Sequence, residues 1–139
     1  MTMSTCTEAK ESPSGPVRVM VVDDHHDYRS LVGTVITATD GFELAGQASS
    51  RAEVADLFAA TERPPDLVLL DVNLGDDSGL EVSQLIQSIA PRVQVVLIST
   101  MARDELPPGA TECGARGYLP KSRVSPTALS EAWAGAYDW

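Results

Sequence analysis

Carboxylate residues follow two apolar runs in this sequence. Asp23 and Asp24 come directly after the run Val17–Val22, and Asp71 directly follows Leu67–Leu70. A carboxylate that is buried without a partner is energetically costly, so this placement indicates strand ends that open into a shared polar pocket. Three carboxylates that converge in one pocket are typical of a site for a hard cation.

A hydroxyl and an amine follow two further apolar runs. Ser99 and Thr100 follow Val93–Ile98, and Lys121 follows the short run Gly117–Pro120. In an open parallel sheet, ligands bind beyond the carboxyl ends of the strands, so one site could collect these groups together with the carboxylates. Thr100 is the better candidate for capping the next segment, which leaves Ser99 for the site.

This set of groups is suited to phosphoryl transfer. Mg²⁺ prefers a few carboxylates, waters and phosphate oxygens, which Asp24, Asp71, a water held by Asp23 and one backbone carbonyl could supply. A carboxylate can form an acyl phosphate when a metal offsets charge and fixed donors hold the transferring group. Asp71 is therefore the predicted nucleophile. Lys121 offers a compact cation to the phosphate, and the Ser99 hydroxyl offers a hydrogen bond.

The rest of the sequence predicts a scaffold that brings strand ends together. From residue 17 onward, short apolar runs alternate with helical patterns, which is typical of parallel strands joined by crossover helices. We therefore expect an α/β fold with a doubly wound, five-stranded parallel sheet. The predicted strands are Val17–Val22, Phe42–Ala48, Leu67–Leu70, Val93–Ile98 and Gly117–Pro120.

Four crossover or terminal helices have clear sequence signals. Apolar residues recur at helical spacing within Tyr28–Ile36, and capping-box patterns begin at Ser50 and Ser78. Ser125 precedes a proline that suits a first helical turn. The remaining helix is interrupted by Pro107–Gly109, whose residues each disfavour a helix interior, so we predict that it is short or irregular.

Composition narrows the class of protein. The chain has 139 residues, enough for one domain, and a formal net charge of -10 that repels nucleic acids and anionic membranes. Cys6 and Cys113 lie far apart without metal-ligand spacing, and no apolar run approaches the roughly 18 residues that span a bilayer. We expect a cytoplasmic protein with a disordered tail over residues 1–16 and one domain over residues 17–139.

Four motifs in order resemble those of a two-component response-regulator receiver domain, in the CheY-like superfamily. The resemblance covers about Val17 to Gly135, and its detail is most similar to receivers of LuxR-type regulators. The motifs are Val-Val-Asp23-Asp24-His, Leu-Leu-Asp71-Val-Asn-Leu, Leu-Ile-Ser99-Thr and Gly-Tyr118-Leu-Pro-Lys121.

The resemblance implies a sheet of strand order 2-1-3-4-5 with five flanking helices. It also implies that a histidine kinase or phosphotransfer protein donates a phosphoryl group to Asp71, with Mg²⁺ or Mn²⁺ as cofactor. Such a domain is a switch rather than an enzyme, because it catalyses only its own phosphorylation and slow dephosphorylation. A homodimer or an attached effector domain would be a further partner.

Site roles follow from the resemblance position by position. The face built by the fourth helix, the fifth strand and the last helix would report the switch. The implied roles are phosphoacceptor for Asp71; metal site for Asp23, Asp24, Asp71 and the Asn73 backbone carbonyl; phosphate-site groups for Ser99 and Lys121; and switch residues for Ser99 and Tyr118.

The sequence departs from the receiver pattern in two places. Leu74-Gly75 stands where many receivers have Met-Pro, and Asp76-Asp77 makes that loop more acidic. The interruption at Pro107–Gly109 lies on the presumed output face.

The same residues allow four other interpretations. The irregular fourth helix favours a pseudo-receiver that binds protein partners without phosphorylation. An aspartate-nucleophile phosphatase would need a second acid two residues after Asp71, where Asn73 stands. His25 and His26 invite a transition-metal interpretation, but adjacent residues rarely reach one ion together, so both are better explained as the start of a helix. Tyr118 is equally well explained as a core ring.

Overall fold

A computed structural model describes residues 15–139. Almost all of the predicted tail, residues 1–16, lies outside the described residues, so its predicted disorder stays a prediction. No helix within the described part combines the length and the apolar character that crossing a bilayer requires.

Five parallel strands form the central sheet, in the order β2-β1-β3-β6-β7. This is the predicted order 2-1-3-4-5 when only the strands of this sheet are counted, so the fold class is confirmed. Strands β3 and β6 each end one residue later than predicted, which makes Asp71 and Ser99 their last residues. The strands are β1 Val17–Val22, β2 Phe42–Ala48, β3 Leu67–Asp71, β6 Gln94–Ser99 and β7 Gly117–Pro120.

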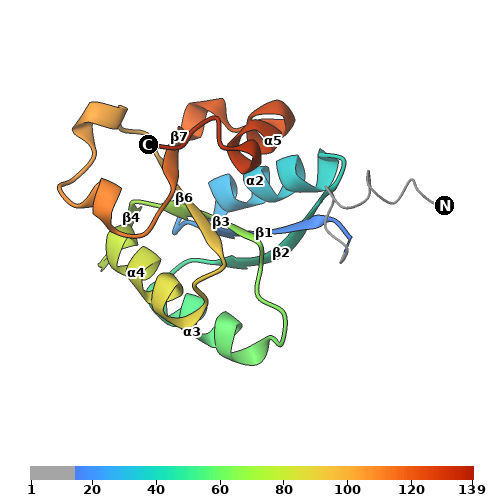
Figure 1. The fold of residues 1–139 in the computed structure, drawn as a ribbon, viewed down its shortest axis with the longest axis horizontal. Helices are drawn as coiled ribbons and strands as arrows, with labels where there is room; N and C mark the ends of the chain where they lie inside the picture. Colours follow the sequence, from blue (N-terminus) through green and yellow to red (C-terminus); the bar gives the residue numbers. More distant parts are fainter. Residues whose placement is uncertain (1–14) are drawn as a thin grey trace.

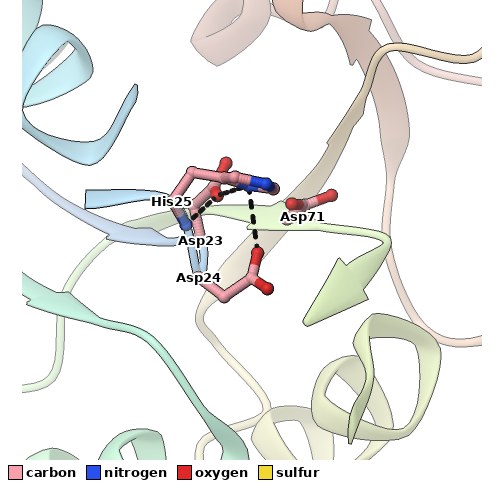
Figure 2. A group of neighbouring side chains, drawn as sticks. All are labelled: Asp23, Asp24, His25 and Asp71. Atoms are coloured by element: carbon pink, nitrogen blue, oxygen red, sulfur yellow. Dashed lines mark hydrogen bonds and ion pairs between the residues drawn. The ribbon is translucent and has the colours of Figure 1, made fainter. Parts of the chain in front are cut away.

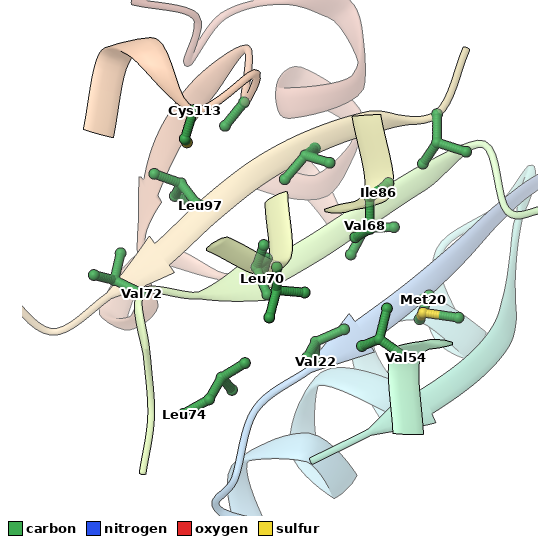
Figure 3. Close-up of a cluster of buried hydrophobic side chains, with 14 of the residues drawn as sticks. Met20, Val22, Val54, Val68, Leu70, Val72, Leu74, Ile86, Leu97 and Cys113 are labelled. Carbon is green, nitrogen blue, oxygen red and sulfur yellow. The ribbon is translucent and has the colours of Figure 1, made fainter. Parts of the chain in front are cut away.

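Two pairs of helices sandwich the sheet (Figure 1). Helices α2 (His26–Ala38) and α5 (Pro126–Ala134) cover one face, while α3 (Arg51–Ala60) and α4 (Gly79–Ile89) cover the other. Successive strand residues point to opposite faces, so each face has its own apolar core. The core under α3 and α4, shown in Figure 3, includes Met20, Val22, Val54, Val68, Leu70, Val72, Ile86 and Leu97. The core under α2 and α5 includes Val19, Val21, Val32, Ile36, Leu67, Leu69, Ile98 and Leu129.

The fourth flanking helix is absent from the described residues, which contain four α-helices rather than the five predicted. Two single 3₁₀ turns, η1 (Arg103–Glu105) and η2 (Ala110–Glu112), replace it between β6 and β7. Pro107 and Pro108 have no N–H to donate, and Gly109 adopts a φ of 91°, which no right-handed helix uses. The predicted irregularity is therefore confirmed.

The helix caps form with small shifts from the predicted pattern. The Ser50 hydroxyl accepts a hydrogen bond from Glu53 N, as predicted for α3. The Glu53 carboxylate, however, accepts from the N–H and hydroxyl of Ser49, one residue before the predicted partner. At α4, the Ser78 hydroxyl accepts from Leu80 N, one residue earlier than in a capping box. Both serines still satisfy a free N–H of a first turn.

The end of the chain turns back onto the sheet, which the sequence did not predict. After α5, the segment Tyr137–Trp139 lies beside the outer edge of β7, close to where Figure 1 marks the C-terminus. Gly117 and Asp138 form an antiparallel bridge, and Tyr118 N donates to the Tyr137 carbonyl at 3.0 Å. The segment therefore covers the open edge of the sheet.

Candidate phosphoryl-transfer site

The predicted site residues gather where the central strands end. Asp23 follows β1, Asp71 ends β3, Ser99 ends β6 and Lys121 follows β7. Asp23, Asp71 and Ser99 are all buried, at 0%, 4% and 3% exposed. Four neighbouring parallel strands thus deliver two acids, a hydroxyl and an amine to one edge of the sheet, as the sequence predicted.

Asp23 is fully buried and held by contacts of its side chain and its backbone. Its Oδ1 accepts a hydrogen bond from His25 N at 2.8 Å. Its Oδ2 lies 2.6 Å from Lys121 Nζ in a buried ion pair. The Asp23 carbonyl accepts from the Arg29 side chain at 2.8 Å. Asp24 is more exposed, with 33% of its side chain accessible, and its Oδ1 lies 3.1 Å from His25 Nδ1.

His25 joins the acidic cluster, which the sequence interpretation missed. Its Nδ1 lies 3.0 Å from Asp23 Oδ1 and 3.1 Å from Asp24 Oδ1, and Figure 2 shows the ring extending toward Asp71. One potential ligand atom from each of these four residues lies within 4.8 Å of the others. The ring reaches the acids because the chain bends at Asp24 and His25 N donates to Asp23 Oδ1, a local geometry that periodicity does not reveal.

His26 does not share this position. Its ring faces Asp27 at 3.5 Å, and its side chain is 78% exposed. The interpretation of His26 as a plain helix-start residue is therefore in keeping with the structure.

Asp71 and Lys121 form the centre of the pocket. Lys121 Nζ donates to Asp71 Oδ2 at 3.0 Å, and Asn73 N donates to Asp71 Oδ1 at 3.1 Å. Burial raises the pKa of Asp71 and the nearby charge of Asp23 adds to this, against the opposing bonds from Lys121 and Asn73. Burial acts to lower the pKa of Lys121, but its contacts with Asp23 and Asp71 outweigh that effect and raise it. The lysine is therefore a fixed cation between two carboxylates.

Asn73, the predicted backbone ligand, and Ser99, the predicted switch hydroxyl, both lie beside Asp71 or at the end of the neighbouring strand, and their roles stay predictions. Asn73 begins a two-residue strand, β4 (Asn73–Leu74), and its N–H is bonded to Asp71. The metal-ligand role of its carbonyl stays a prediction. The Ser99 hydroxyl accepts from Met101 N at 3.0 Å, so it holds the start of the following loop.

Tyr118 already points inward. Its side chain is 1% exposed, and its hydroxyl donates to the carbonyls of Ser99 (3.0 Å) and Met101. Burial raises its pKa, while the cation of Arg103, 6.0 Å from the ring centre, opposes that rise. The core interpretation of this ring is in keeping with the structure, and its role as a switch stays a prediction.

Tyr28 supports Lys121, although the sequence marked it only as part of a helix face. Lys121 Nζ lies 4.7 Å from the centre of the Tyr28 ring, and the Tyr28 hydroxyl donates to the Lys121 carbonyl at 2.9 Å. Burial, with Asp23 and Asp71 nearby, raises the pKa of Tyr28, which therefore stays neutral. No local sequence motif predicts this contact, because Tyr28 and Lys121 lie 93 positions apart.

The loop that departs from the receiver pattern folds into a small hairpin beside the site. Strand β4 pairs with β5 (Asp77–Ser78), and Gly75 at the turn has a φ of 68°. Asp77 accepts a hydrogen bond from Arg51 N at 2.9 Å, so it caps α3 rather than joining the acidic cluster. Gly79 follows, and a Cβ there would lie 2.1 Å from the Asp71 carbonyl. A side chain is excluded where α4 begins.

Known proteins are similar to this chain in sequence. A model of the response regulator receiver domain matches residues 19–133. The response regulator GacA of Pseudomonas viridiflava is 35% identical over 105 residues, which make up 76% of this chain and 48% of GacA. The chemotaxis protein CheY of Thermotoga maritima is 28% identical over 115 residues, 83% of this chain and 92% of CheY. The chain thus spans about half the length of GacA.

Solved structures agree on the fold. The signal receiver domain of NarL from Mycobacterium tuberculosis has a TM-score of 0.74 at 28% identity, covering 87% of this chain and 95% of that one. A two-component response regulator of the LuxR family from Aurantimonas sp. has a TM-score of 0.74 at 26% identity, with 87% and 84% covered. With its sheet order and its acidic pocket, the chain belongs to the response regulator receiver domain family.

Proposed function

We propose that this chain is a signalling switch that accepts a phosphoryl group on Asp71. One observation carries the proposal: the buried Asp71 carboxylate lies 3.0 Å from the Lys121 ammonium and within 4.8 Å of a cluster of further potential cation ligands. In this proposal Asp71 is the nucleophile, and its carboxylate adjoins both a fixed positive charge and a candidate site for Mg²⁺ or Mn²⁺. The donor would be the phosphohistidine of a histidine kinase or phosphotransfer protein.

The residues of the pocket divide the work of transfer. An oxygen of Asp71 attacks phosphorus, the bond from phosphorus to the donor imidazole nitrogen breaks, and the imidazole leaves with the bonding electrons. Lys121 opposes the effect of burial on the Asp71 carboxylate and then holds a phosphoryl oxygen. A divalent cation held by Asp23, Asp24, Asp71 and the Asn73 carbonyl would offset charge on the transferring group.

The Ser99–Tyr118 contact provides a route from the phosphoryl group to the output face. In the proposed switch, the Ser99 hydroxyl gives up its bond to Met101 N and donates to a phosphoryl oxygen. Because Tyr118 is bonded to the carbonyls of both Ser99 and Met101, this movement changes the ring's contacts. The ring is already inward, so the proposed switch relies on a shift of the loop rather than on a turn of the tyrosine from solvent.

The alternatives explain fewer observations. A pseudo-receiver is motivated by the two 3₁₀ turns that replace the fourth helix, but it gives no role to Lys121 bridging two buried acids. A phosphatase of the aspartate-nucleophile class would need an acid where Asn73 stands. The phosphoacceptor function accounts for both the pocket and the residues around it.

The partners and location follow from the same proposal. A histidine kinase or phosphotransfer protein would be the phosphodonor, and an effector domain or a second copy of the chain would receive the signal. The net charge of -10 disfavours direct contact of this chain with nucleic acid or anionic membrane. We propose a cytoplasmic location, which suits a switch that receives its phosphoryl group from a histidine kinase.

A phosphodonor assay tests the function directly. The protein is incubated with Mg²⁺ and phosphoramidate, whose P–N bond resembles that of phosphohistidine, and modified protein is resolved on a phosphate-affinity gel. We expect a retarded band for the wild type and for Asp76→Asn, which removes an exposed acid of the neighbouring loop. We expect none for Asp71→Asn. An unmodified wild type, or equal modification of Asp71→Asn, would overturn the proposal.

A further inference from the structure

We infer that His25 is a nitrogen ligand of the proposed cation site and shifts its preference from Mg²⁺ toward divalent transition ions. This inference rests on the proposed function, because it concerns the same pocket. It adds to that function a ligand of a different chemical type and, with it, a different class of preferred ion.

The position of the imidazole fits direct coordination. In an octahedral site with bonds of about 2.1 Å, neighbouring ligand atoms lie roughly 3 Å apart. His25 Nδ1 lies 3.0 Å from Asp23 Oδ1 and 3.1 Å from Asp24 Oδ1, with an atom of Asp71 inside the same 4.8 Å limit. In Figure 2 dashed lines join the ring to both Asp23 and Asp24, and the ring extends toward Asp71.

The backbone holds this ring in place. His25 N donates to Asp23 Oδ1 at 2.8 Å, and the His25 carbonyl accepts from Arg29 N at 3.0 Å. These two bonds fix the residue where α2 begins. The side chain itself is 70% exposed, so an ion and its remaining waters can reach Nδ1 from solvent.

The charges of the pocket place the ion on the histidine side. Lys121 Nζ lies against Asp23 Oδ2 and Asp71 Oδ2. The opposite oxygen of Asp23 and the Asp24 carboxylate face His25. A second cation is therefore attracted to the side that Lys121 leaves open, where the imidazole can bind it through Nδ1 with its proton on Nε2.

The ligand set decides which ion is favoured. Mg²⁺ takes oxygen ligands almost exclusively, so it would bind the carboxylates and leave the ring aside. Divalent transition ions bind imidazole well, and Co²⁺ is stabilised more than Mn²⁺ along the series. The acids thus provide binding to either class, whereas His25 adds affinity only for the transition ions.

Metal titrations separate the role of His25 from that of the acids. Co²⁺ and Mg²⁺ are titrated into the wild type, His25→Gln, His26→Gln and Asp24→Asn by calorimetry, with the visible absorption of Co²⁺ followed in parallel. We expect His25→Gln to weaken Co²⁺ binding by at least about tenfold, the lower range for loss of even an outer-sphere partner. Mg²⁺ binding should change less than about twofold. His26→Gln should match the wild type, and Asp24→Asn should weaken both ions.

Several outcomes would count against the inference in different ways. If His25→Gln and the wild type bind Co²⁺ equally and with the same absorption spectrum, His25 is not a ligand, and the proposed function stands. If His26→Gln loses as much Co²⁺ affinity as His25→Gln, the effect is not specific to the ring in the pocket. If the wild type binds neither ion, the inference and the metal-dependent part of the proposed function both fail.

Discussion

At the scale of single residues, the pocket depends on the ion pairs that Lys121 makes. It is the cation of two buried ion pairs, with Nζ at 2.6 Å from Asp23 and 3.0 Å from Asp71. Two carboxylates in a buried site repel each other, and desolvation disfavours the charge on both. One ammonium between them offsets both costs, and the Tyr28 ring and hydroxyl hold that ammonium and its backbone in position.

Removal of this cation should destabilise the fold as well as the function. Lys121→Met keeps most of the side-chain volume but leaves Asp23 and Asp71 without their cation. We expect the free energy of unfolding at pH 7 to fall by about 3 kcal/mol, the lower range for breaking a buried ion pair. Urea unfolding measures the change. Arg123→Met, which removes an exposed cation two residues away, should change it by less than about 0.5 kcal/mol. Equal losses in the two variants would contradict this account of Lys121.

At the scale of elements, the edge of the sheet depends on a close approach that only glycine allows. A Cβ on Gly117 would lie 2.1 Å from the Tyr137 carbonyl, so the segment Tyr137–Trp139 can pair with β7 only where the side chain is missing. Trp139 strengthens the contact, because its indole N–H donates to the Ala115 carbonyl at 2.8 Å. Arg103 also lies 5.4 Å from the centre of the Trp139 ring. The segment therefore joins β7 to the 3₁₀ turns that replace the fourth helix.

Gly117→Ala should detach this segment while the sheet stays folded. In a Trp133→Phe background, Trp139 is the only tryptophan, so its fluorescence reports the segment alone. We expect a red shift of the emission maximum, because the partly exposed indole loses its contacts with Ala115 and Arg103 and becomes fully solvated. Gly46→Ala is the matched control, since a Cβ there meets only side chains at 3.7 Å or more. An unchanged emission maximum in Gly117→Ala would mean that the segment does not depend on this contact.

At the scale of the whole molecule, the sequence predicted the features that depend on apolar runs and on the residues that end them, namely the strands and the site residues at the strand ends. Short runs rich in apolar residues between turn signals predicted the strands, and β1, β2 and β7 have the predicted bounds. The interruption of the fourth helix was predictable for a similar reason, because proline acts locally. His25 in the cluster and Tyr28 against Lys121 were missed, since a turn's local geometry and a contact over 93 positions leave no periodic signal. Gly117 was predicted as strand, but not as the site where the C-terminal segment docks.

The distribution of charge over the whole molecule leads to a last prediction. A net charge of -10 opposes the compact state, and the acidic cluster concentrates that repulsion in one pocket. Monovalent salt only screens it, whereas a divalent ion that binds the folded state stabilises it by mass action, by about 2.7 kcal/mol at 100 times the dissociation constant. MgCl₂ should therefore raise the thermal midpoint more than NaCl at equal ionic strength. Asp24→Asn should abolish the excess effect of MgCl₂ over NaCl, and Asp76→Asn should keep it. Of these two acids, Asp24 belongs to the acidic cluster and Asp76 does not. The same excess in all three proteins would instead assign the effect to diffuse screening of the surface.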